Sequence, residues 1–170
     1  MDIRLIIGLI GSVVLVTGVA MTDQKKKNSL FAIGNACMLT YAFLGYMQGG
    51  PIFFLILQLF IALSTVSMLF NIPDKYDTPM LTIGGIALVG WSLSLFEDYS
   101  TAIFVVGLAL LGIGFAMSAG TFKREAALMI GSAVIAIFSY LMRDWIFLGL
   151  NVLFAALSLV NIRRMQMKRS

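Results

Sequence analysis

Long apolar runs alternate with short polar segments along the whole chain. A helix that crosses a bilayer needs about 20 mostly apolar residues, with a range of about 17–25. The charged and turn-forming residues divide this chain into seven pieces of about that length. We therefore predict seven transmembrane helices, at about residues 5–21, 29–47, 51–71, 80–96, 101–119, 125–142 and 145–162.

The polar segments between these helices differ in character. Residues 22–27 end in three lysines and are predicted to form a basic turn. Gln48-Gly49-Gly50-Pro51 is predicted to be a tight hairpin, because proline suits the first turn of the helix that follows. Residues 73–79 are polar and lie between two prolines, which makes them the candidate boundary between two halves. Residues 163–170 form a basic tail.

Two segments of the chain are nearly the same. Residues 59–66 match residues 153–160 at six of eight positions, 94 residues apart. Upstream the spacing is 97, and it pairs Ile33-Gly34 with Ile130-Gly131 and a basic pair at 26–27 with one at 123–124. Any two Leu/Phe/Ala-rich helices resemble each other, but a match across helices, a hairpin and a basic turn favours a duplicated fold.

The duplication predicts three helices, one linker helix and three helices. The expected boundaries are 1–73 for the first repeat, 74–100 for the linker helix and 101–170 for the second repeat with its tail. Because three is odd, a second triplet joined directly would be inverted in the membrane. The single linker helix restores its direction, which predicts two parallel repeats related by an axis along the membrane normal.

Composition and charge support a membrane location and set the orientation. The chain is 60% hydrophobic and 12% charged, against about 45–50% and 25% in soluble domains. Its mean hydropathy is +0.98. We expect an all-α, multi-pass protein of the cell (inner or plasma) membrane, and the first span, which has no convincing cleavage site, is expected to be retained.

Lysine and arginine accumulate in cytoplasmic loops. With seven spans, Arg4 and Arg143 lie on one face, and the opposite face holds Lys25, Lys26, Lys27, Lys75, Lys123, Arg124, Arg163, Arg164, Lys168 and Arg169. The N-terminus is therefore expected outside and the C-terminus in the cytoplasm.

The predicted spans hold no acidic or basic side chain at bilayer depth, and the chain has no histidine. Such groups mark proton relays and voltage sensors, and acid–base hydrolysis needs them near the substrate. We therefore expect neither a proton-coupled carrier nor an enzyme. The single Cys37 has no histidine partner and is expected to pack as a small apolar side chain. No metal, cofactor or nucleic-acid partner is expected.

Neutral polar and aromatic side chains are the remaining candidates for a solute site. In hydrocarbon, an amide must find a partner or line a wet cavity. Asn151 lies about two turns into its helix, and its two readings, a substrate contact and an interhelical hydrogen bond, stay open. The set predicted to bind solute contains amides, a hydroxyl and two deep aromatic rings: Asn151, Asn35, Gln58, Tyr41, Phe138 and Ser139.

The three-one-three pattern resembles the SWEET sugar facilitators and their single-triplet relatives, the SemiSWEETs, which pair as dimers. The residues that carry the resemblance are Phe138-Ser139-Tyr140-Leu141, the Arg143-Asp144-Trp145 hairpin and Asn151. They look like that family's aromatic helix end, Asp-Trp hairpin and pocket asparagine. The resemblance implies that Asn151 faces a solute pocket. The motif covers about 25 residues. PnuC-type vitamin carriers share the same architecture, but their Trp-rich motifs are not found in this sequence.

This chain departs from the family in its first helices and its pocket. The family's Pro-Gln pair is missing, since the matching regions read Met21-Thr22-Asp23-Gln24 and Met117-Ser118-Ala119-Gly120. The pocket tryptophan is also missing, and at a spacing of 94 the place of Asn151 falls on Leu57 in the first half, with Gln58 beside it.

We expect a transporter that moves a small, neutral, polar solute, sugar-like or vitamin-like, by facilitated diffusion. The alternatives are a non-transporting scaffold or accessory subunit and a lipid-handling membrane protein. The expected partners are the bilayer and the solute, and association between copies of the chain stays open.

Overall fold

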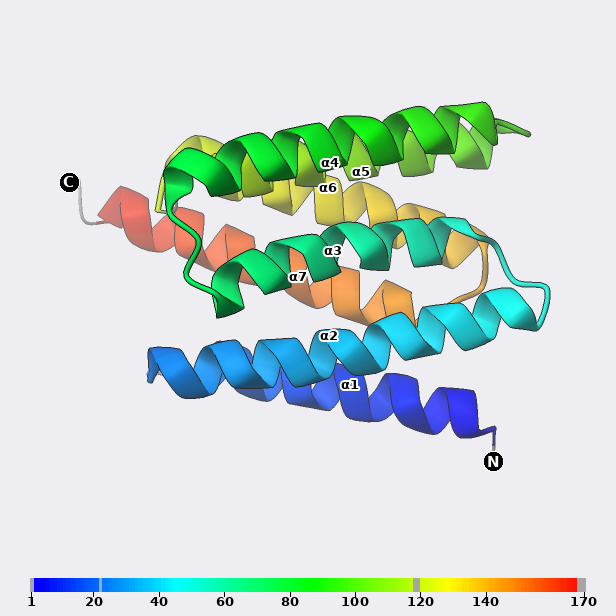
Figure 1. Ribbon diagram of the computed structural model, residues 1–170, viewed down its shortest axis with the longest axis horizontal. Helices are drawn as coiled ribbons and strands as arrows, with labels where there is room; N and C mark the ends of the chain where they lie inside the picture. Colours follow the sequence, from blue (N-terminus) through cyan, green and yellow to red (C-terminus); the bar gives the residue numbers. More distant parts are fainter. Residues whose placement is uncertain (1, 22, 118–119, 168–170) are drawn as a thin grey trace. The chain divides into compact units, whose positions relative to one another are not determined.

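The computed structural model describes residues 2–21, 23–117 and 120–167, and in these ranges it is helical without a strand (Figure 1). This confirms the predicted all-α class. The described helices are α1 (Ile3–Ala20), α2 (Gln24–Met47), α3 (Phe53–Leu69), α4 (Asp74–Ser94), α5 (Tyr99–Ala116), α6 (Phe122–Leu141) and α7 (Trp145–Met167).

Four of the described helices, α2, α5, α6 and α7, are long and apolar enough to cross a bilayer. Helices α1 and α3 are apolar but shorter. Helix α4 begins with charged residues and contains Pro79. The four long apolar helices are compatible with a helical membrane protein, as the composition predicts.

Three polar segments that were predicted to lie outside the helices are helical, so those boundaries were wrong. Asp23 accepts hydrogen bonds from the backbone N–H groups of Lys25 and Lys26, at 2.9 and 3.2 Å, and so begins α2 inside the basic segment. Helix α4 begins at Asp74, directly after Pro73. Helix α7 continues through most of the basic tail to Met167. Hydropathy does not detect these ends, because capping and charged helical turns are polar.

The chain folds as two compact units, Met1–Asp77 and Thr78–Ser170. In the first unit α2 packs against both α1 and α3, and in the second unit α6 packs against both α5 and α7. Each of these packing arrangements follows the order of the helices along the chain. Helix α2 is therefore central in the first packing arrangement and helix α6 in the second.

Glycines allow the close approach between the first two helices of the first unit. A Cβ atom built on Gly34 would lie 2.6 Å from Leu15 Cγ, and one built on Gly11 would lie 3.2 Å from Met38 Sδ. Neither distance leaves room for a larger residue without movement. Small residues at such positions are the usual means by which membrane helices approach closely.

The second unit repeats these contacts. A Cβ atom on Gly131 would lie 3.0 Å from Leu111 Cγ, and one on Gly107 would lie 2.7 Å from Ile135 Cδ1. Gly131 and Ile135 follow Gly34 and Met38 by 97 residues, while Gly107 and Leu111 follow their counterparts by 96. The same glycine–side-chain contacts therefore recur in both units.

Candidate functional site

The six predicted site residues are divided equally between the two units, and each unit is described by itself. In the first unit, the Asn35 amide nitrogen of α2 donates to Thr65 Oγ1 of α3 over 2.6 Å. The Thr65 hydroxyl in turn donates to the Ile61 carbonyl over 2.8 Å. Asn35 therefore joins two helices, which is the packing role of a polar side chain in a membrane protein.

The Tyr41 ring is buried and lies beneath a cation. The Arg4 guanidinium carbon is 4.5 Å from the ring centroid, within the range of a cation–π interaction. Arg4 also lies against the backbone of α2, since a Cβ atom on Gly45 would be 2.8 Å from one of its terminal nitrogens. One face of the Tyr41 ring is thus covered by Arg4 and is closed to a stacking ligand.

Gln58 differs from the other polar side chains of the first unit. Its side chain is only 1% exposed, and its Oε1 atom is buried without a hydrogen-bond partner among the described residues. A buried amide oxygen without a partner costs about 1–3 kcal/mol in proteins. It is the only uncharged side chain in the described ranges that is left in this state.

In the second unit, two of the predicted residues lie on α6, and both have partners within the protein. Phe138 is fully buried, and its ring centroid lies 5.1 Å from that of Phe104 on α5. The Ser139 hydroxyl donates to the Ile135 carbonyl over 2.8 Å. Phe138 therefore packs between α5 and α6, while the Ser139 hydroxyl bonds within its own helix.

Asn151 is also buried, at 6% exposure. Its amide nitrogen donates to the Phe147 carbonyl of its own helix over 2.8 Å, and no hydrogen bond joins Asn151 to another helix in the described part of the chain. Phe147 in turn donates its backbone N–H to Asp144, which is buried and caps α7. The interhelical hydrogen bond that the sequence left open for Asn151 is therefore absent among the described residues.

Burial in the third helices of the two units also fits a spacing one residue shorter than the predicted one. Both helices bury a phenylalanine, a leucine followed by an amide, and a hydroxyl side chain seven residues after that amide. These are Phe54, Leu57, Gln58 and Thr65 in α3, and Phe147, Leu150, Asn151 and Ser158 in α7. At this spacing of 93 Gln58 corresponds to Asn151, whereas at the predicted spacing of 94 the buried Phe53, Ile56 and Leu57 correspond to Phe147, Leu150 and Asn151.

A second pair of contacts supports this spacing. The Asn28 amide nitrogen donates to the Met68 carbonyl over 3.4 Å in the first unit. In the second, the Asn161 amide nitrogen donates to the Glu125 carboxylate over 3.2 Å. Glu125 follows Asn28 by 97 residues and Asn161 follows Met68 by 93. The sequence signal that could have revealed the spacing of 93 is that, in both third helices, a hydroxyl side chain follows the amide by seven residues.

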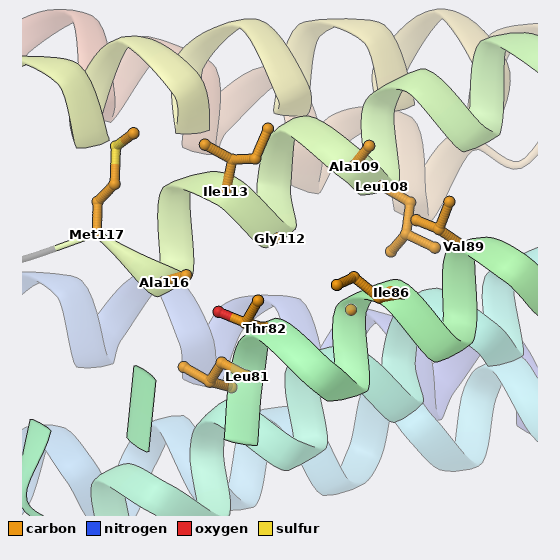
Figure 2. A pocket seen from close by; sticks show the side chains of 11 residues that line it. Leu81, Thr82, Ile86, Val89, Leu108, Ala109, Gly112, Ile113, Ala116 and Met117 are labelled. Atoms are coloured by element: carbon orange, nitrogen blue, oxygen red, sulfur yellow. The ribbon is translucent and has the colours of Figure 1, made fainter. Parts of the chain in front are cut away.

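Two grooves occur away from the predicted site residues. The larger, of about 480 Å³, lies between α4 and α5 in the second unit (Figure 2). Its lining is apolar except for Thr82 and includes Leu81, Ile86 and Val89 of α4, Leu108 and Ile113 of α5, and Met117 directly after α5. The smaller, of about 390 Å³, lies between α2 and α3 and is lined by Leu39, Thr40, Phe43, Leu55 and Leu59.

None of the six predicted site residues lines either groove. The described residues also contain no group of three potential metal ligands. Comparison of the chain with protein-family models, curated proteins and solved structures gives no match.

Proposed function

We propose that the chain is a multi-pass transporter of the cell membrane that moves a small, neutral, polar solute by facilitated diffusion. In this proposal the two units are parallel three-helix repeats, α4 is the linker helix, the N-terminus is outside and the C-terminus is cytoplasmic. The recurrence of the same glycine contacts in both units supports the repeat. The distribution of lysine and arginine supports the orientation.

The observation that carries the proposal is the unsatisfied amide oxygen of Gln58. In hydrocarbon, a polar group without a partner is expensive, and such a group is expected where water or a ligand supplies the missing bond. A solute hydroxyl or amide would donate to Gln58 Oε1. Asn151 is the corresponding amide of the second repeat and is the second proposed contact.

The solute class is to be found first, from the thermal stability of the detergent-purified protein with sugars, nucleosides, vitamins and amino acids. A ligand that binds the folded state stabilises it by RT ln(1 + [L]/Kd), about 2.7 kcal/mol at a hundredfold excess over Kd. The stabilising compound is then labelled, and its uptake into proteoliposomes is measured with all ion gradients collapsed.

Gln58→Met tests the site, because methionine keeps the length of the side chain and removes the amide. We expect uptake and ligand stabilisation to be lost while the protein stays folded. Gln48→Met, in the exposed α2–α3 hairpin, is the matched control and is expected to behave as the wild type. Unchanged uptake in Gln58→Met would contradict the site, and strict dependence on a proton or sodium gradient would contradict facilitated diffusion.

A non-transporting scaffold is the second candidate function. It is favoured by the hydrogen bonds of Asn35 to Thr65 and of Asn151 to its own helix, which are packing contacts. This function predicts no stabilisation by any solute in the panel and a stable complex with another membrane protein, recovered by co-purification from native membranes.

A further inference from the structure

The groove between α4 and α5 exists because these two helices do not approach closely. No Cα atom of α4 lies within 8 Å of one of α5 in the described ranges, whereas packed helices have their axes about 8–10 Å apart and their backbones closer at the contact. Three small residues of α5, Ala109, Gly112 and Ala116, deepen the groove from one side (Figure 2). The space left is narrow, apolar and elongated along the helices.

The groove has the depth of one bilayer leaflet. Along α5 its lining runs from Leu108 to Met117, and at 1.5 Å per residue this is roughly 14 Å. Along α4 it runs from Leu81 to Val89, roughly 12 Å. Half of a hydrocarbon core of about 30 Å is about 15 Å. Met117 directly follows the end of α5, so if α5 crosses the bilayer the groove would reach from its middle to one surface.

Basic side chains begin the helix that follows the groove-lining end of α5, although neither of them lines the groove itself. A Cβ atom on Gly114 would lie 2.7 Å from Leu128, so the last turn of α5 lies beside the start of α6. The first turn of α6 contains Lys123, which is exposed, and Arg124, which is half-buried and whose buried Nε atom has no hydrogen-bond partner among the described residues. Thr82, the polar residue of the groove lining, donates its hydroxyl proton to the Thr78 carbonyl over 2.8 Å. It therefore has no proton left to donate to a ligand.

We propose that this groove binds one acyl chain of an anionic phospholipid from the cytoplasmic leaflet, with the phosphate at the basic first turn of α6. The apolar lining and leaflet depth fit the chain, and Lys123 and Arg124 complement the charge of the headgroup. Anionic lipids are concentrated in the cytoplasmic leaflet. The inference rests on the orientation proposed above and is independent of transport.

Native mass spectrometry of the full-length protein tests the proposal, after equilibration with equal amounts of phosphatidylglycerol and phosphatidylcholine. We expect one tightly retained phosphatidylglycerol per chain. Ala109→Phe with Ala116→Phe fills the groove and is expected to lower retention more than tenfold, since several buried methylene groups lose their contacts. Ala87→Phe is the matched control, because Ala87 is exposed on α4 and outside the groove. Equal retention in the filled and control variants would overturn the proposal.

The headgroup contact is tested separately. Lys123→Gln and Arg124→Gln are each expected to reduce the preference for phosphatidylglycerol over phosphatidylcholine about fivefold. The corresponding basic pair of the first unit supplies the controls, Lys26→Gln and Lys27→Gln, which are expected to leave the preference unchanged. Equal retention of the two lipids by the wild type would overturn the assignment of an anionic headgroup.

A measurement on the wild-type chain keeps the proposal testable if the filled variant does not fold. Phosphatidylglycerol with a photoreactive acyl chain is expected to label peptides from the groove-lining faces of α4 and α5. Labelling spread evenly over all helices, or concentrated on the groove between α2 and α3, would overturn the proposal.

Discussion

Gln58 and Asn151 occupy corresponding positions but are satisfied differently. Asn151 has a shorter side chain, and its nitrogen reaches the carbonyl one turn back in its own helix. The longer Gln58 side chain makes no hydrogen bond through its Oε1 atom. The amide in the second unit is therefore hydrogen-bonded within its own helix, whereas the amide oxygen in the first unit has no partner among the described residues.

This difference predicts opposite effects on stability. Removing an unsatisfied buried amide removes its desolvation cost, so Gln58→Met is expected to raise the free energy of unfolding by about 1 kcal/mol without ligand. Asn151→Leu removes an amide that has a partner, and no gain is expected. SDS titration of the detergent-purified protein measures the free energy of unfolding of both variants. A loss of stability in Gln58→Met would mean that the protein itself satisfies the amide.

A second residue, Asp98, links stability to pH. Asp98 caps α5, and the hydrogen bond from the Ser100 hydroxyl, 2.6 Å long, is the main cause that lowers the pKa of this carboxyl below 3.8. The backbone N–H groups of Thr101 and Ser100 lower it further, while burial opposes them. A carboxylate with a lowered folded pKa stabilises the protein above its unfolded pKa and loses that effect as the pH falls through the folded pKa.

The wild type is therefore expected to be more stable than Asp98→Asn at neutral pH. This advantage is expected to shrink in the acid range, as the pH falls through the lowered pKa of Asp98 and its carboxylate is protonated. Thermal unfolding of the two proteins in parallel over the acid range measures the difference. A difference that does not change with pH would show that the cap does not depend on the charge of Asp98.

At the scale of the helices, the sequence predicts where the apolar cores lie but not where the helices begin. All seven described helices overlap the predicted ones. The errors lie where polar residues are helical, as at Lys25–Lys27, which were assigned to a turn because they are charged. Asp23 makes this segment helical through backbone hydrogen bonds that hydropathy does not register.

The candidate site was less predictable than the helices. The shared identities suggest a spacing of 94 for the third helices, while four buried positions and one pair of interhelical hydrogen bonds fit a spacing of 93. The spacing thus falls from 97 to 93 across the second hairpin. Helix α6 ends at Leu141, the counterpart of Leu44, whereas α2 continues to Met47. The spacing falls by four residues, which is about one helical turn.

The close helix contacts predict a large effect of one methyl group. A Cβ atom on Gly131 would lie 2.9 Å from the backbone nitrogen of Leu111, and backbone cannot move aside as a flexible side chain can. Gly131→Ala is expected to destabilise the second unit by about 1–3 kcal/mol. Gly149 of α7 has no atom within 4 Å of such a Cβ, so Gly149→Ala is expected to stabilise by up to about 1 kcal/mol. SDS titration compares the two variants, and equal effects would contradict the close contact.

At the scale of the whole molecule, the orientation of the chain is a prediction open to direct test. A cysteine-free background requires one change, Cys37→Ala, since Cys37 is the only cysteine. Gln48→Cys and Met167→Cys then place single exposed thiols in the α2–α3 hairpin and near the end of α7. In intact cells, an impermeant maleimide is expected to label Gln48→Cys and to label Met167→Cys only after lysis. The reverse pattern would contradict an external N-terminus, and labelling of both on one side would contradict seven spans.

The two units share their small-residue contacts but not their polar side chains. Gly34 and Gly131 make equivalent contacts, while the positions of Asn35 and Thr65 in the first unit are taken by two serines, Ser132 and Ser158, in the second. If the units descend from one ancestor, selection has preserved the packing and allowed the polar positions to diverge. A scaffold of this kind can acquire a new ligand through a few substitutions without rebuilding its helix contacts, so proteins that share this architecture need not share a solute.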